Sequence, residues 1–191
     1  MFSSVRACAT EVGAPRPGDD LVADTRVVVM DRAFTVGAPP QVLWPWIVQL
    51  GKQRAGWYLP RAVERWIPHS HRAIRHIDPQ WQGLATGDVI PDYGGRAATF
   101  TVARIEAPIS LVYASQRGRM AVSWDISLRD AGSPGGIDTN GTVATRVHLR
   151  LRLAPVRRRR LAESVGDAFD ALTIAGMAGG LRERLADRTR R

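Results

Sequence analysis

Two stretches in the C-terminal half of the chain alternate between apolar and polar residues. In 120–129 the even-numbered positions are apolar, and in 142–153 the odd-numbered ones are apolar apart from one threonine. A period of two is typical of a β-strand with one covered face and one face in water. The residues between them, 132–141, are rich in Gly, Ser, Pro and Asn and predict a turn. We therefore expect an antiparallel hairpin whose wet face carries Ala121, Ser123, Asp125, Ser127, Arg129, Arg146, His148, Arg150 and Arg152.

The patterns around this hairpin complete an α+β arrangement. We expect strands over 26–36, 98–106 and 110–115, short helices over 41–50 and 60–66, and a loop-like region over 68–95. A single long helix is predicted over 156–187 from a helical-spacing stripe of Leu161, Val165, Phe169 (or Ala168), Leu172 and Ala175. This order predicts a curved antiparallel sheet wrapped around a long C-terminal helix, with two short helices after the first strand. Since a helix stripe and a concave sheet do not match fully, we also expect a cavity between them.

The predicted terminal helix contains a stretch of small residues, AGMAGG at 175–180. A glycine inside a helix costs ~1 kcal/mol relative to alanine. We expect compensation, either from close packing onto the sheet or from space left for a bound molecule.

The length of 191 residues fits one domain, at roughly 100–200 residues each. We expect a flexible N-terminal arm over 1–17 and a single domain over 18–191. No apolar run reaches the ~18 residues that span a membrane, and the first residues carry no apolar segment of a signal peptide. A single cysteine, Cys8, permits no internal disulfide. These features predict a cytoplasmic protein without an integral membrane segment.

The formal charge is +9, with 27 Lys and Arg residues of which only Lys52 is lysine. So high a share of arginine indicates codon bias in a GC-rich genome rather than selection for phosphate contacts. Much of the excess lies near the C-terminus, and no aromatic RNA-binding signature accompanies it. We therefore expect a solvated basic face and no nucleic-acid partner.

Several stretches resemble one family. Residues 38–51, APPQVLWPWIVQLG, resemble an "APPxxVWPWLVQxG" helix, and 54–58, RAGWY, resemble "RxGWY". Weaker similarities lie in 18–22, in 77–82 (IDPQWQ against "IxPExQ"), in 84–88 and in 124–128. The chain is thus similar to the START-like (SRPBCC) superfamily, in its polyketide cyclase/dehydrase-like branch, over 18–154. It departs from the pattern at Gln80, where Glu is preferred, and at Leu43, where Val is usual before the tryptophan.

This resemblance implies the helix-grip fold and a small hydrophobic ligand, such as a lipid or a polyketide, held between the sheet and the C-terminal helix. Neither a cofactor nor a metal is implied. Large aromatic side chains could line such a cavity and add a polar N–H or O–H. The candidate ligand-binding residues are Trp57, Tyr58, Trp81, Tyr93, Phe100, Tyr113, Trp124 and Met177.

Two alternatives remain open. One is a polyketide cyclase or aromatase using the same cavity, which needs an acid or base beside a carbonyl; the groups that could supply it are Tyr58, Asp88, Asp92, Tyr93 and Tyr113, although no recognised triad or dyad is present. The other is a non-catalytic module that docks an acidic partner through the arginine-rich helix end. The sequence assigns no catalytic residue and no oligomeric state.

Histidines at positions 69, 71 and 76 have a spacing that could bind a metal. They lie in a stretch rich in Pro and Arg, without cysteine nearby, so we expect a solvated loop. We expect His148 to lie on the wet face of the sheet.

Overall fold

The computed structural model describes residues 5–95, 97–131, 143–156 and 159–189, with side chains of the last helix described from Asp170 to Asp187. Its helices are α1 (Ala9–Gly13), α2 (Pro40–Gln49), α3 (Arg61–Glu64) and α4 (Arg159–Thr189). Its strands are β1 (Val28–Val36), β2 (Val89–Pro91), β3 (Thr99–Glu106), β4 (Ser110–Arg117), β5 (Met120–Asp130) and β6 (Thr145–Ala154). The predicted α+β class and the order of its main elements are confirmed.

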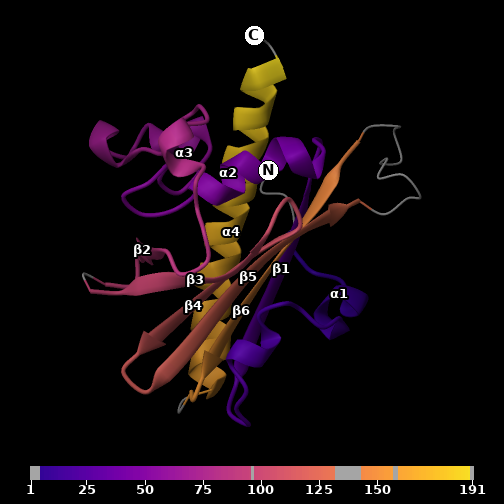
Figure 1. Ribbon diagram of the computed structural model, residues 1–191, viewed down its shortest axis with the longest axis vertical. Helices are drawn as coiled ribbons and strands as arrows, with labels where there is room; N and C mark the ends of the chain where they lie inside the picture. The colour runs from indigo at the N-terminus through magenta and orange to yellow at the C-terminus, as the bar shows by residue number, and fades with distance from the viewer. Residues whose placement is uncertain (1–4, 96, 132–142, 157–158, 190–191) are drawn as a thin grey trace.

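The described strands form one six-stranded sheet in the order β1-β6-β5-β4-β3-β2, with antiparallel neighbours throughout. The predicted hairpin is its centre, because β5 pairs with β6 from Ala121↔Ala154 to Asp130↔Thr145. The turn expected over 132–141 lies outside the described residues. Helix α4 runs the length of the molecule along one face of the sheet (Figure 1). None of the helices in the described part of the chain combines the length and apolar character needed to cross a membrane.

The buried side of α4 differs from the predicted stripe. Leu172 is 63 % exposed. The side chains of the predicted positions 161–169 lie outside the described ones. The buried apolar residues of the helix begin at Ile174 and repeat at helical spacing: Ile174, Met177, Ala178, Leu181 and Leu185. The prediction extended the helical spacing of the first apolar positions, and this spacing does not coincide with the buried face of the second half of the helix.

The three glycines in the described part of α4 are explained by a loop rather than by the sheet or a ligand. A Cβ on Gly180 would lie 2.5 Å from the backbone nitrogen of Leu59, and one on Gly176 would lie 2.7 Å from the Leu59 side chain. A Cβ on Gly179 would meet the ring of Pro60 at 2.9 Å. The segment between α2 and α3 therefore crosses α4 at backbone contact distance, which a larger residue would prevent.

The region predicted as loop-like, 68–95, contains more structure than expected. It holds two 3₁₀ turns, His69–His71 and Pro79–Trp81, and strand β2, which extends the sheet through Ile90↔Phe100. A strand of three residues is too short to show a period, which is why the sequence did not reveal it. Helix α2 matches its prediction, and α3 is a single turn where 60–66 was expected.

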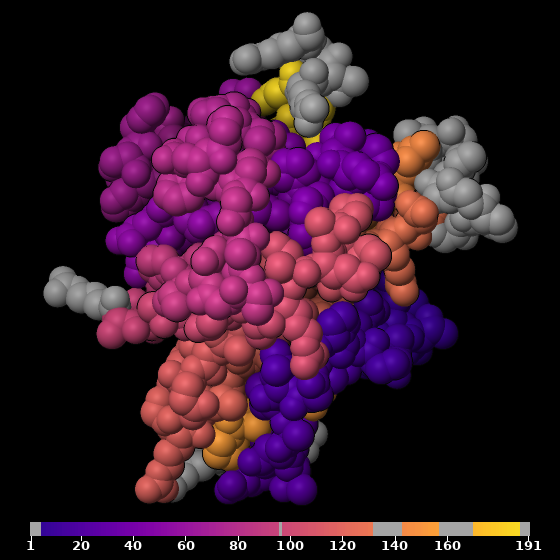
Figure 2. All heavy atoms as spheres, in the orientation of Figure 1, coloured from indigo at the N-terminus to yellow at the C-terminus, as the bar shows by residue number. Residues whose placement is uncertain are grey.

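The predicted wet face of the sheet is the main error of the sequence analysis. Ser123, Asp125 and Ser127 of β5 are buried, and so are His148 and Arg150 of β6. Residues 5–22 cover them: a Cβ on Gly18, for example, would lie 3.6 Å from the Cβ of Asp125. Figure 1 shows the N-terminal segment in front of the sheet with α4 behind it, and Figure 2 shows its indigo atoms covering the lower right of this face.

Ion pairs and backbone contacts hold this N-terminal segment in place. The buried Glu11 accepts hydrogen bonds from Arg146, at 2.8 and 2.9 Å, and from Arg129. Arg150 donates to the carbonyl oxygens of Val12 and Ala14 at 2.6 and 3.0 Å. Arginines that looked like a solvated basic face thus bind the chain's own N-terminal segment. The flexibility of an arm over 1–17 stays a prediction.

Candidate functional site

A cavity of about 550 Å³ lies between the sheet and α4, on the face opposite the N-terminal segment. The sheet contributes side chains from β1, β3, β4, β5 and β6, and the helix closes the other side. The segment after β2 and one tryptophan from the loop after α2 complete the wall. The lining residues of this aromatic cavity are Met30, Trp57, Asp92, Tyr93, Gly94, Phe100, Arg117, Val122, Trp124, Leu151, Leu153, Asp170, Thr173 and Ile174.

A cluster of five aromatic rings forms one wall. The Trp124 ring stacks on Trp57, with centroids 6.0 Å apart, and on Tyr113 at 5.7 Å. Phe100 is tilted against both Trp124 and Tyr113. Tyr93 meets Trp57 edge to face at 6.2 Å. The strand pairing Tyr113↔Trp124 places two of these rings side by side, and stacked rings hold one another in a fixed orientation.

Trp57 also joins this wall to the helix. Its indole nitrogen donates a hydrogen bond of 3.3 Å to the carbonyl oxygen of Thr173 in α4. The polar N–H of this indole is therefore already matched within the protein.

The charged groups of the cavity occur as pairs. Asp92 forms an ion pair with Arg117, whose guanidinium lies 5.3 Å above the Phe100 ring. Asp170 lies 3.1 Å from Arg32. Burial, with a smaller contribution from Asp92, raises the pKa of the Tyr93 hydroxyl. At neutral pH this hydroxyl is a neutral hydrogen-bonding group, and each carboxylate faces an arginine.

Four predicted site residues line this cavity: Trp57, Tyr93, Phe100 and Trp124. Tyr113 lies directly behind them, buried and stacked on Trp124. The sheet brings Phe100, Tyr113 and Trp124 together, because β3, β4 and β5 are neighbours, while Trp57 and Tyr93 reach them from loops.

Three predicted site residues lie elsewhere. Tyr58 is fully buried, and its hydroxyl donates to the carbonyl oxygen of Trp46 at 2.9 Å. Met177 is a fully buried core residue of α4, and Trp81 lies under the guanidinium of Arg54 at 4.9 Å. Burial raises the pKa of both Tyr58 and Tyr113, so neither hydroxyl ionises near neutral pH.

The sequence missed part of the lining for two different reasons. Val122, Leu151 and Leu153 lie on the apolar faces of the predicted hairpin, so the alternation could have identified them. The pairing of Asp92 with Arg117 left no such signal, because these residues are 25 positions apart and meet only through the sheet. Asp88, also weighed as an acid, accepts a hydrogen bond from the backbone of Ala85 at 2.9 Å in a turn.

The histidines fall into two environments. His69, His71 and His76 are exposed, and no group of three potential metal ligands occurs among the described residues. His148, expected on a wet face, is buried instead, with its Nε2 2.7 Å from a carboxylate oxygen of Asp31. It lies under the N-terminal segment, on the opposite face from the aromatic cavity.

Two arginines near the C-terminal end of α4 bind groups within the molecule. Arg184 is fully buried, donates to Glu64 at 2.6 Å and binds the carbonyl oxygens of Leu59, Ala73 and Ile74. Arg182 donates to the carbonyl oxygen of Thr35. The side chains at 157–160, 188, 190 and 191 lie outside the described ones.

The chain matches no protein-family model and no curated protein. Similar solved structures include CalU16 from Micromonospora echinospora, at 15 % identity and a TM-score of 0.42, covering 82 % of each chain. Protein MLL2253 from Mesorhizobium loti shares 20 % identity over 86 % of this chain and 98 % of that one, with a TM-score of 0.44. DynU16, a protein of the dynemicin biosynthetic locus, shares 16 % identity over 83 % of this chain and 47 % of that one, with a TM-score of 0.44. Similarity at this level carries no functional argument, so the function has to be argued from the cavity itself.

Proposed function

We propose that this chain is a START-like helix-grip protein that binds one small, neutral, largely apolar molecule in the aromatic cavity. The observation that carries the proposal is the ring cluster around Trp124, which offers a flat apolar wall to a hollow of about 550 Å³. Binding cavities for small molecules commonly measure roughly 300–1,000 Å³ and are lined by apolar and aromatic side chains with a few polar groups. The order of strand, two short helices, antiparallel strands and long helix supports the fold assignment.

The charges around the cavity favour a neutral ligand. Asp92 and Asp170 each form an ion pair with an arginine, so neither carboxylate needs a positively charged group on the ligand. Breaking such a pair to accommodate an ionic ligand would leave a partly buried charge uncompensated. Hydroxyl or carbonyl groups on the ligand would be matched by the Tyr93 hydroxyl at the rim.

The first test is native mass spectrometry of the freshly purified chain, followed by denaturation and organic extraction. A mass excess that is released as a neutral apolar compound supports the proposal and reveals the ligand class. A co-purifying charged nucleotide or peptide would contradict it.

The second test uses the neutral fluorescent probe N-phenyl-1-naphthylamine. We expect saturable binding with a stoichiometry of one, and a loss of about tenfold in affinity for Trp124→Ala, since the stacking surface disappears. Trp66→Ala is the matched control, because Trp66 is 78 % exposed and does not line the cavity. Equal affinities of the two variants would refute the proposed site.

A further inference from the structure

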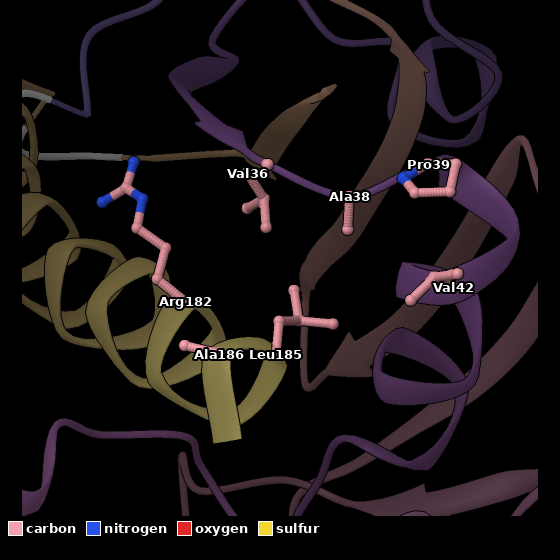
Figure 3. A pocket seen from close by; sticks show the side chains of 8 residues that line it. Val36, Ala38, Pro39, Val42, Arg182, Leu185 and Ala186 are labelled. Carbon is pink, nitrogen blue, oxygen red and sulfur yellow. The ribbon is translucent and has the colours of Figure 1, made fainter. Parts of the chain in front are cut away.

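A second cavity, of about 530 Å³, lies where the end of β1, the start of α2 and the last turns of α4 meet. It shares no lining residue with the aromatic cavity. Figure 3 shows Val36 and Ala38 on one side, Val42 of α2 on another and Leu185 of α4 facing them. We name it the β1–α4 cavity; its lining residues are Val36, Gly37, Ala38, Pro39, Val42, Arg182, Leu185 and Ala186.

Arg182 is the one charged residue in this lining, and its position is fixed by the fold. Its Nε and Nη2 atoms donate to the carbonyl oxygen of Thr35, at 3.1 and 2.8 Å. Its guanidinium carbon lies 5.9 Å from the centre of the Phe34 ring. The Nη1 atom makes no hydrogen bond to any residue in the described part of the chain, so its two N–H groups and the second N–H of Nη2 remain to be matched.

Arg182 also lacks an anionic partner among the described residues. Across the described residues, no carboxylate lies within ion-pair distance of its guanidinium. Its neighbour on the same helix, Arg184, binds Glu64 at 2.6 Å. In the aromatic cavity, the lining carboxylates Asp92 and Asp170 are paired with arginines. Burial lowers the pKa of Arg182, which is the direction expected when a cation loses water without gaining an anion.

We propose that the β1–α4 cavity binds a small amphipathic monoanion, an alkyl carboxylate, with its carboxylate on Arg182 and its chain against Val36, Val42 and Leu185. A guanidinium matches a carboxylate in charge and in the geometry of its donors, and such charge-assisted hydrogen bonds are about twice as strong as neutral ones. One arginine balances one negative charge, which favours a carboxylate over a phosphate dianion. This site does not depend on the function proposed for the aromatic cavity, which lacks an unmatched charge.

The test compares three probes that separate the charge from the chain: octanoate, octan-1-ol and acetate. We expect octanoate to bind in a saturable manner by calorimetry and to shift the NMR methyl signals of Val36, Val42 and Leu185. Octan-1-ol, which keeps the chain and lacks the charge, and acetate, which keeps the charge and lacks the chain, should each bind at least about tenfold more weakly.

Two variants locate the site. Arg182→Gln should weaken octanoate about tenfold and leave octan-1-ol unchanged, while Arg65→Gln, an exposed arginine of the loop after α3, is the matched control. Because Arg182→Gln also loses contacts to Thr35, Ala186→Trp gives a second variant; Ala186 is exposed on α4, and a large side chain there should fill the cavity without disturbing the core. Trp124→Ala should leave octanoate binding unchanged, whereas it weakens the neutral aromatic probe.

Three results would overturn the proposal. The first is octanoate affinity that is unchanged in both Arg182→Gln and Ala186→Trp. The second is octan-1-ol binding as tightly as octanoate, which would remove the role of the charge. The third is an octanoate response confined to signals of Trp57 and Trp124, which would place the ligand in the other cavity.

Discussion

The two faces of the sheet come from the same alternating strands and are used in opposite ways. On the inner face, apolar side chains of β5 and β6 pack against α4 and leave the aromatic cavity. On the outer face, the alternate positions of these strands are polar, and the N-terminal segment covers them through Glu11, Asp19 and backbone carbonyls. A cavity can remain where apolar side chains of a curved sheet pack against a helix. Buried charged groups, in contrast, each need a hydrogen-bonding partner. The polar face is therefore the closed one, covered by the N-terminal segment.

The largest effect is expected from a pair of leucines on the inner face. Leu149 and Leu151 lie two positions apart on β6, but Leu149 is fully packed whereas Leu151 borders the cavity. We expect Leu149→Ala to lower the free energy of unfolding by about 4 kcal/mol and Leu151→Ala by about 1 kcal/mol, since truncation beside an existing hollow creates little new void. Urea unfolding measures both. Similar losses for the two variants would show that this face is packed uniformly.

A slightly smaller loss is expected on the outer face from Asp31→Ala. The carboxylate of Asp31 is buried and lies 2.8 Å from Arg150 and 2.7 Å from His148. Removing this carboxylate leaves buried N–H groups without their anion and should lower the free energy of unfolding by about 3 kcal/mol. This is the low end for buried ion pairs, because Arg150 keeps its second ion pair, with Asp19. Arg26→Ala, which removes an exposed ion pair, is the control and should cost below about 0.5 kcal/mol. If both variants unfold at the same urea concentration, the outer network contributes no stability.

The next effect is pH-dependent and concerns Glu11. Its hydrogen bonds from Arg146 hold the pKa of the Glu11 carboxyl far below its ordinary value of 4.5. A lowered folded-state pKa stabilises the fold above the unfolded value, and this stabilisation is lost as the pH falls below about 4.5. We expect Glu11→Gln to cost about 1.5 kcal/mol at neutral pH, since Arg129 and Arg146 retain contact with water.

The measurement for Glu11 is urea unfolding of both proteins across the acid range. The difference between wild type and Glu11→Gln should shrink as the pH falls, because the wild-type carboxylate becomes protonated. A difference that stays constant with pH would mean that the carboxylate charge does not hold the N-terminal segment.

The smallest effect is expected at the rim of the aromatic cavity. Tyr93 is 55 % exposed, and its ring meets Trp57 edge to face. Tyr93→Phe keeps the ring, so the affinity for N-phenyl-1-naphthylamine should change by less than about twofold. Its pKa is raised, so probe binding to the wild type should also be flat through neutral pH. A loss as large as that of Trp124→Ala would assign the hydroxyl, rather than the ring wall, the main part in binding.

Much of the cavity wall could be predicted because its signal is local. The alternation in 120–129 and 142–153 placed Trp124 on the inner face, and the strand pattern of 98–106 placed Phe100 on a strand of the same sheet. Tyr58 and Met177 show where this approach fails. Their size and apolar character suit a cavity wall and a packed core equally well, and only their neighbours distinguish the two. The same holds for Asp92 and Arg117, whose pairing depends on strands distant in sequence.

The sequence by itself determined the longer strands, the central hairpin, the long terminal helix and the side of the hairpin strands on which apolar residues lie. These properties follow from the period of the side chains along a single segment. Tertiary structure alone decided what covers each side. His148 and Arg150 occupy the alternate positions expected to face water. They are buried because residues 5–22 cover this face of the sheet, and carboxylate and carbonyl oxygens of this segment accept hydrogen bonds from Arg150. Alternation records that two faces differ in polarity, and it contains no information about a partner more than a hundred residues away.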